Sequence, residues 1–471
     1  MTSFQIASEL INFVPIHAGG GDLWPAWEDV QRIVSLRDHN TRVVLFGVMC
    51  LGLASGVVGT FMLLRKRSLM GDAVSHATFP GIGLAFLVMV AAGGTGKYVP
   101  GLLLGALVTG VIGMGTVLFI RGTSRLKEDA ALGIVLSVFF GAGSAVFGVI
   151  QNMNGAAAGL NDFIYGRTAS MVVVDAQLIA ITAIVVVVVC ALLYKEFRML
   201  CFDQGYAAAQ GWPVVFLDTV MMLMVVIVTV IGLQAVGLIL VVAMLIVPAA
   251  AARFWTEQLL PMLVISATIG MVSGVVGAGV SGFVPDLPAG AVIVLTASIC
   301  FLFSFVFGSA RGLARRGLQH MRLGQTIARQ NLLRTMYEWW ETQQNATAAG
   351  DCALGIGWDL LLAARSWSPR RLRRSVRRSL SKGLVYEGSD HLYHFTEVGM
   401  SEARRIVRNH RLWEFYLITH AEIAPARVDR DADRIEHVLG HEMVDRLEEL
   451  LAREYPQRVV PPSPHELDSF E

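Results

Sequence analysis

The chain has 471 residues, of which 54% are hydrophobic and only 16% are charged. This composition excludes an ordinary soluble domain, in which about a quarter of the residues are charged. The apolar residues occur in blocks of about 20, which is long enough to cross a bilayer as helices. Charge is sparse from about Thr41 to Gly308 and dense afterwards, so the formal net charge of +1 hides two regions. The sequence therefore predicts a membrane domain followed by a soluble tail.

The cysteines and the N-terminal segment exclude further classes. Five cysteines are scattered along the chain without a Cys-x-x-Cys pair, which argues against a disulfide framework and a thiolate zinc site. Residues before Arg42 lack the basic start and apolar core of a cleavable signal peptide. Residues 1–40 are instead expected to be extracytoplasmic or interfacial, with an interfacial helix over Leu23–Arg37 that places Trp24 and Trp27 at the headgroups.

Residues 41–308 are predicted to form the membrane domain, with about nine transmembrane helices. Basic residues cluster after the first, third, fifth, seventh and ninth spans, whereas the alternate loops hold only Lys97 and Arg167 as exceptions. By the positive-inside rule the N-terminus is outside and the tail is cytoplasmic. The predicted spans are Thr41–Leu64, a second from the stretch around Asp72 to Gly93, Gly101–Ile120, Ala130–Ile150, Val172–Tyr194, Val214–Ile231, Ala235–Ala252, Met262–Val280 and Ala289–Phe307.

An aspartate and a histidine lie near the start of the second predicted span, within Ser68–Phe86. Asp72 and His76 are four residues apart, so they share one face of a helix. An ionisable pair that enters lipid is costly unless it faces a pore or a partner, which makes it a functional-site hypothesis. One oxygen and one imidazole ligand suit Mn²⁺, Zn²⁺ or Fe²⁺. The alternative is structural: Asp72 caps the helix start and His76 bonds to the backbone.

A second motif lies in the loop after the fifth predicted span, CFDQGYAAAQGW over Cys201–Trp212. It is short, amphipathic and ends in glycine, which favours a short helix on which a soluble motor can dock. Together with three other segments, in chain order, it resembles the permease subunit of the zinc, manganese and iron ABC importers. The resemblance covers roughly Thr41–Phe307. Its other segments are GDAVSHATFPGIGLAF, LQAVGLILVVAMLIVPAAAARF and SGFVPDLPAG.

This resemblance implies an all-α polytopic membrane protein of the cytoplasmic (inner) membrane. Asp72 and His76 then line the metal path, and the metal is the substrate, with no tightly bound cofactor. Mn²⁺, Zn²⁺ and Fe²⁺ share these ligands. The implied coupling helix, which docks on the ATPase, contains Phe202, Asp203, Ala207 and Gly211.

The partners follow from the same resemblance. The chain has no Walker A sequence (GxxxxGK followed by Ser or Thr), so it is not expected to be an enzyme, and ATP hydrolysis belongs to a separate ATPase subunit. A periplasmic metal-binding protein is expected to deliver the ion. The second permease subunit is either a copy of this chain or a paralogue, and both contact membrane lipid.

The tail is predicted to contain a winged helix-turn-helix domain over residues 320–398. Helices are expected over Leu323–Thr342, Asp351–Ala364 and Ser368–Lys382, followed by strand-like runs at Leu384–Glu387 and His391–Phe395. The third helix is strongly basic, which is typical of contact with DNA phosphates, with anionic lipid or with a partner subunit. DNA is the less expected contact, because a membrane anchor limits access to an operator. The basic residues are Arg370, Arg371, Arg373, Arg374, Arg377 and Arg378.

A second resemblance covers about Gln330–Leu451, with a helical dimerisation domain over residues 399–452 and an extended or disordered tail over 453–471. This part resembles the diphtheria-toxin-repressor-like iron and manganese regulators. The resemblance implies a metal sensor in which four ligand positions match and two, Asp429 and Asp433, are altered. The first helix departs from the pattern, because Asn331 and Arg334 stand where those regulators offer ligands, and an arginine cannot ligate. The four matching residues are His410, Glu414, Glu436 and His437.

These observations predict a permease subunit of an ATP-driven importer of divalent transition metals with a regulator-like cytoplasmic domain. The tail is then either a metal sensor, or a domain in which Arg334 supplies the charge of the metal, or a set of ordinary surface ion pairs. The alternative function is a membrane-tethered metal-dependent DNA-binding regulator. A passive channel or secondary carrier is disfavoured by the coupling-loop resemblance.

Overall fold

A computed structural model of the chain describes residues 38–152, 168, 171–283, 287–346 and 355–420, apart from residues 95, 97 and 366. The described chain is mostly helical and divides into two compact units between Arg315 and Arg316. The predicted interfacial helix over Leu23–Arg37 and the predicted extended tail over 453–471 lie outside the described residues.

The membrane unit contains eight described helices that are long and apolar enough to cross a membrane. The seventh span, which the sequence predicts over Ala235–Ala252, is shorter in the structure. It corresponds to α12 (Leu238–Ala252), which has 15 residues and is therefore shorter than a typical crossing. The reason is Gly237, which has a φ of +81° and is the one residue between the end of α11 and the start of α12. The eight long helices are α3 (His39–Leu64), α4 (Met70–Ala91), α5 (Val99–Thr123), α6 (Glu128–Gln151), α8 (Val173–Leu192), α11 (Val214–Val236), α13 (Leu259–Phe283) and α14 (Ala289–Phe307).

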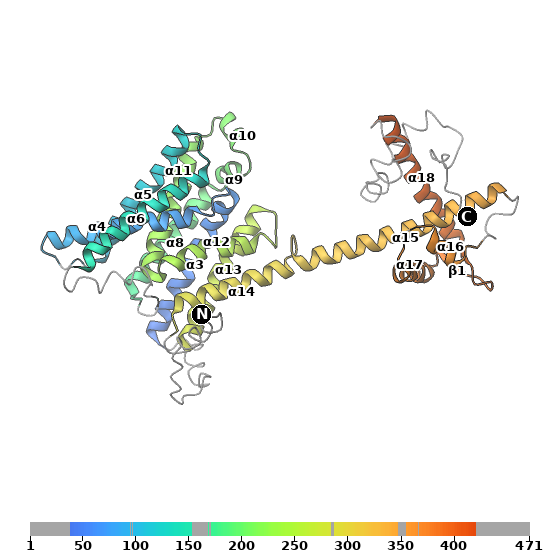
Figure 1. Ribbon diagram of the computed structural model, residues 1–471. Helices are drawn as coiled ribbons and strands as arrows, with labels where there is room; N and C mark the ends of the chain where they lie inside the picture. Colours follow the sequence, from blue (N-terminus) through green and yellow to red (C-terminus); the bar gives the residue numbers. More distant parts are fainter. Residues whose placement is uncertain are drawn as a thin grey trace, which may run out of the picture. The chain divides into compact units, whose positions relative to one another are not determined.

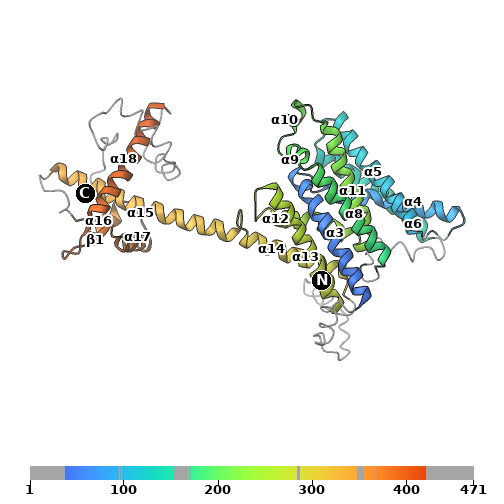
Figure 2. The same cartoon turned by 180° about the vertical axis from the view of Figure 1, so that it is seen from behind.

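The helices of this unit pack in two groups that share α11 (Figures 1 and 2). In one group α3 packs against α8, α12 and α13, and α14 packs against α12 and α13. In the other group α4 packs against α5 and α6. Small residues allow the closest approaches: a Cβ added at Gly52 would collide with the backbone of Gly270, and one added at Gly81 with that of Gly105. The position of α4 is therefore fixed by backbone contact with α5.

Two short helices connect α8 to α11, at one end of the bundle (Figure 1). They are α9 (Tyr194–Phe202) and α10 (Gln204–Ala209). Asp203 begins α10, because its carboxylate accepts a hydrogen bond from the Tyr206 amide at 2.9 Å. Gly211, with a φ of +80°, lies in the turn that follows. The structure thus contains the short helix that the sequence predicts between Cys201 and Trp212.

The second unit has the order of elements predicted from the sequence. The helix predicted over Asp351–Ala364 is shorter than expected in the described residues, because Ile356 pairs as a β-bridge with Tyr393. The strands form an antiparallel hairpin in which Val385 opposes Phe395. Leu332, Leu372, Val385 and Val407 are buried in the shared core. The elements are α15 (Leu313–Ala346), α16 (Trp358–Ala363), α17 (Pro369–Ser381), β1 (Val385–Glu387), β2 (Tyr393–Phe395) and α18 (Glu397–His420).

Candidate metal path and coupling network

The structure brings Asp72 and His76 together on the first two turns of α4. His76 Nε2 lies 3.4 Å from Asp72 Oδ1. The side chains are 18% exposed for His76 and 37% exposed for Asp72, so the pair is reachable from outside the single chain. Asp72 lies in the first turn, where the helix dipole favours a negative charge. The pair therefore offers one carboxylate and one imidazole at a half-buried position, as the spacing predicts.

Aromatic side chains hold the His76 ring in place. Phe140 of α6 contacts it edge to face, with the ring centroids 5.0 Å apart. Phe79 stacks on Phe147 of α6 at 4.3 Å and on Phe140 at 6.4 Å, which extends the apolar wall. His76 Nδ1 is buried and has no hydrogen-bond partner among the described residues. A buried polar atom without a partner costs about 1–3 kcal/mol, which a bound ligand or a second protein chain would offset.

Pro80 adds a backbone group to this site. It lies inside α4 and has no N–H, so it cannot donate the helical hydrogen bond to the carbonyl of His76. A carbonyl oxygen released in this way is a hard ligand of the kind that divalent cations bind. Among the described residues, however, no group of three or more His, Cys, Asp and Glu side chains lies close enough to hold a metal ion. Asp72 and His76 from one chain are therefore an incomplete set of ligands.

A buried ion network, which the sequence prediction missed, lies where several of the bundle's connections meet. We call its five members the arginine network. At its centre Asp218 of α11 forms a two-pronged pair with Arg67, with oxygen–nitrogen distances of 2.7 and 3.0 Å. Arg67 and Asp218 are 3% and 6% exposed at their side chains. The other members contact this pair or one another: Arg65, Arg121 and Glu128.

The network ties the connecting helices to the start of α4. Arg65 donates to the carbonyl of Leu200 on α9 at 2.9 Å and to Gln204 Oε1 on α10 at 3.4 Å. The same guanidinium contacts Asp218 at 3.1 Å. Arg67 accepts, through its carbonyl, a hydrogen bond from the amide of Met70, the first residue of α4. A continuous chain of contacts thus runs from α10 to the helix that carries Asp72 and His76.

One of the missed residues, Asp218, left a signal in the sequence, and another, Phe140, did not. Asp218 is a lone carboxylate inside a predicted span, where an ionisable residue indicates a functional or paired position. Phe140 left none, because an aromatic residue in an apolar helix is ordinary core composition. Cys201, next to the network, is not a metal ligand candidate, because burial raises the pKa of its thiol to about 12.

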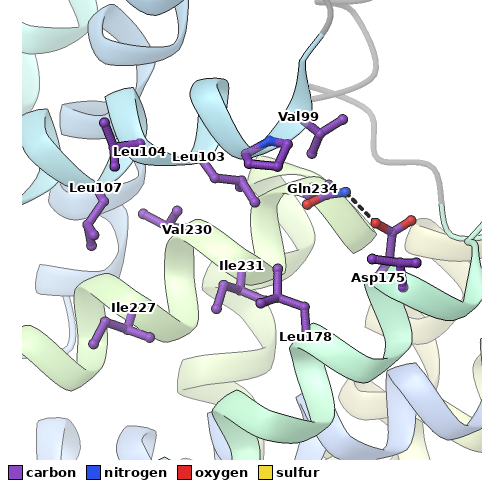
Figure 3. A pocket seen from close by; sticks show the side chains of 12 residues that line it. Val99, Leu103, Leu104, Leu107, Asp175, Leu178, Ile227, Val230, Ile231 and Gln234 are labelled. Atoms are coloured by element: carbon purple, nitrogen blue, oxygen red, sulfur yellow. Dashed lines mark hydrogen bonds between the residues drawn. The ribbon is translucent and has the colours of Figure 1, made fainter.

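A groove between α5, α8 and α11 has different chemistry (Figure 3). It has a volume of about 460 Å³ and is lined by apolar side chains such as Leu103, Leu107 and Ile231. Its polar groups lie at one end, where the Gln234 amide donates to Asp175 Oδ1 at 2.8 Å. The groove therefore suits apolar chains rather than a hydrated cation, and it is separate from the Asp72–His76 pair.

In the second unit, α17 presents its six arginines to solvent, while Leu372 and Val376 face the core. The helix is thus amphipathic in the way that the sequence predicts. One guanidinium, that of Arg373, lies over the ring of Trp358 at 5.9 Å. The exposed arginines are Arg370, Arg371, Arg373, Arg374, Arg377 and Arg378.

The predicted sensor residues of α18 are buried, and they contact an arginine. His410 is 2% exposed and Glu414 is 0% exposed at their side chains, and His410 Nε2 lies 3.1 Å from Glu414 Oε1. Arg334 Nη1 lies 3.1 Å from His410 Nδ1. Both ring nitrogens of His410 are therefore engaged by protein groups, and the described residues do not fit a metal ion here. The other predicted ligands lie outside the described residues: Asp429, Asp433, Glu436 and His437.

A helical membrane bundle with a carboxylate–imidazole pair on one span and a short connecting helix outside the bundle defines a transport subunit. The chain belongs to the ABC 3 transport family, which matches residues 37–308. Residues 396–461 match the iron dependent repressor, metal binding and dimerisation domain. These two matches confirm the prediction of a permease with a regulator-like tail and favour it over the alternative, a membrane-tethered regulator.

The relatives are membrane components of metal transport systems. The manganese transport system membrane protein MntC of Bacillus subtilis (strain 168) is 37% identical over 400 residues, which cover 84% of this chain and 88% of the relative. The family match ends at residue 308, so an alignment of 400 residues must also include part of the tail. The zinc transport system membrane protein TroC of Treponema pallidum (strain Nichols) is 42% identical over 58% of this chain and 91% of its own length.

A solved structure shows the same fold for the membrane unit. It is PsaBC from Streptococcus pneumoniae in complex with Fab, with 31% identity and a TM-score of 0.53. The match covers 60% of this chain and 97% of that chain.

Proposed function

We propose that the chain forms one half of the membrane pathway of an ATP-driven importer of divalent transition metals, with Mn²⁺ or Zn²⁺ as cargo. The manganese and zinc systems named for its relatives support this class of substrate. The observation that carries the proposal is the half-buried Asp72–His76 pair with its unpartnered His76 Nδ1. Carboxylate and imidazole ligands are suited to these ions, and not to alkali ions.

The pathway needs a second permease subunit, either a copy of this chain or a paralogue. Two side-chain ligands do not replace the water shell of a divalent ion, and the described residues offer no third His, Cys, Asp or Glu side chain to complete the set. An equivalent pair from the facing subunit would raise the number of side-chain ligands to four. The site would then form only between the two subunits, and it would open and close as they move.

ATP hydrolysis takes place in a separate ATPase subunit that docks on α10 from the cytoplasmic side, where the tail also lies. A periplasmic binding protein delivers the ion. The arginine network carries the motion of α10 to α4, because Arg65 contacts both Gln204 and Asp218, and Arg67 contacts both Asp218 and the start of α4. A buried, multiply bonded network is stiff enough to pass on a displacement.

Metal uptake into vesicles that contain the assembled importer tests the proposal. Asp72→Ala and His76→Ala are each expected to reduce ATP-dependent Mn²⁺ and Zn²⁺ uptake to background while the protein still inserts. The reason is that each change removes a ligand from a site with few ligands. Matched controls are Asp129→Ala and His320→Ala, both at exposed positions, which are expected to transport normally. Normal uptake by either site variant would refute the site assignment.

A further inference from the structure

The contact between α15 and α18 in the tail is built around a buried guanidinium. Arg334 of α15 is 2% exposed. Its Nε donates to Glu338 Oε1 of the same helix at 2.6 Å, and its Nη1 lies 3.1 Å from His410 Nδ1 of α18. His410 in turn lies 3.1 Å from Glu414. Among the described residues these four side chains form a row of contacts, and Arg334 is its permanently charged cation.

The chemistry of the row fixes the proton positions on His410. A guanidinium has donors and no acceptor, so Nδ1 of His410 must accept with its lone pair. The ring hydrogen then lies on Nε2, which donates it to the Glu414 carboxylate. A metal ion binds imidazole through an unprotonated nitrogen, and the one such nitrogen of His410 already accepts from Arg334.

A divalent cation at His410 would also meet the charge of Arg334 at close range. Like charges repel strongly where water is excluded, and Arg334, His410 and Glu414 are each buried. Next along the helices, Arg411 of α18 pairs with both carboxylate oxygens of Glu341 on α15. The two helices are thus joined by two side-chain contacts that need no metal.

We propose that Arg334 is the internal cation of the α15–α18 contact and occupies the place where His410 and Glu414 would otherwise bind a divalent ion. The tail closes at this position without metal, although residues 396–461 match a metal-binding and dimerisation domain. If a regulatory signal acts on the tail through α18, that signal is therefore not the binding of a metal ion by His410. The tail is a preassembled module at this contact rather than a switch that metal closes.

Counting Mn²⁺ bound to the purified full chain in detergent micelles tests this proposal. All proteins carry Asp72→Ala and His76→Ala, so the transport site does not contribute and the result does not depend on the proposed transport function. Adding His410→Ala is expected to leave Mn²⁺ binding unchanged. Adding Arg334→Glu is expected to create one further Mn²⁺ site per chain, because a carboxylate then joins His410 and Glu414.

Two variants make the outcomes decisive. Arg334→Lys keeps the charge and is expected to gain no site, and Arg334→Glu combined with His410→Ala is expected to lose the site that Arg334→Glu creates. A loss of Mn²⁺ binding on His410→Ala with Arg334 present would overturn the proposal. A folded Arg334→Glu protein that gains no site would also overturn it. If Arg334→Glu does not fold, the His410→Ala comparison decides alone.

Discussion

The helices that the structure describes contain two pairs of a histidine and a carboxylate four residues apart, one in each unit. In the membrane unit the Asp72–His76 pair is partly exposed, and one nitrogen of His76 has no partner among the described residues. In the tail the His410–Glu414 pair is buried, and Arg334 engages the second ring nitrogen. On the proposals made above, the spacing of such a pair does not decide metal binding; the third group beside the imidazole does.

The largest expected effect comes from making the membrane pair resemble the tail pair. Phe140 contacts the His76 ring, so Phe140→Arg places a guanidinium beside the metal path. Metal uptake by the assembled importer is expected to fall to background, because the cation repels the metal and competes for the imidazole. Phe140→Leu, the matched control, keeps the apolar wall and is expected to retain most of the uptake. Equal uptake by the two variants would contradict the comparison.

The next effect concerns the stability of the tail. Arg334→Ala removes the buried guanidinium that contacts Glu338 and His410, and breaking a buried ion pair costs about 3 kcal/mol or more. Hydrogen exchange in α18 of the full chain is therefore expected to become roughly a hundredfold faster. Arg322→Ala, at an exposed position on the same helix, is the control and is expected to change little. Similar exchange in both variants would show that Arg334 does not hold the two helices together.

A smaller effect is expected in the arginine network. Asp218→Asn removes the charge that Arg65, Arg67 and Arg121 share, which is expected to weaken the proposed coupling of α10 to α4. The metal transported per ATP hydrolysed is expected to fall about fivefold or more, as for the loss of a coupling free energy of about 1–3 kcal/mol. ATP hydrolysis itself is expected to continue, which a merely unfolded protein would not do. Asp129→Asn is the exposed control, and an unchanged ratio in Asp218→Asn would exclude the network from coupling.

The smallest effect lies in the hairpin of the tail. The amide of Leu392 donates to Asp390 and holds the pKa of that carboxyl below its usual value. A depressed pKa adds stability that is present above the pKa of the unfolded chain and is lost as the pH falls through the pKa of the folded one. The protection factors of the hairpin amides, which compare their exchange with the intrinsic rate at the same pH, are therefore expected to fall at acidic pH, around and below the ordinary pKa of an aspartate. Asp390→Asn should remove this pH dependence, and a persistent dependence would assign it to another group.

Much of the fold could be predicted from the sequence, because long apolar runs and their flanking charges carry the signal. The ends of the helices before α11 follow the predicted spans closely, and α10 lies where the motif CFDQGYAAAQGW predicts a helix. The shortening of α12 could not be predicted, because Gly237 divides an apolar run whose composition is uniform.

In the candidate sites, too, local features could be predicted from the sequence and long-range contacts could not. Asp72 and His76 were predictable, since their spacing on one helix is local information. The contacts of Asp218 with Arg67 and of Arg334 with His410 join residues 151 and 76 positions apart, so only the packing of the helices reveals them. The sequence gives a reason to suspect Arg334, because an arginine cannot ligate, but not that its guanidinium lies against His410.

Locating Mn²⁺ directly in the assembled importer, by anomalous scattering from crystals soaked with Mn²⁺, tests the contrast between the two pairs most directly. The account predicts an Mn²⁺ peak beside Asp72 and His76 and none within bonding distance of His410. A peak at His410 with Arg334 displaced, or a chain that binds Mn²⁺ elsewhere and leaves His76 without it, would contradict the account.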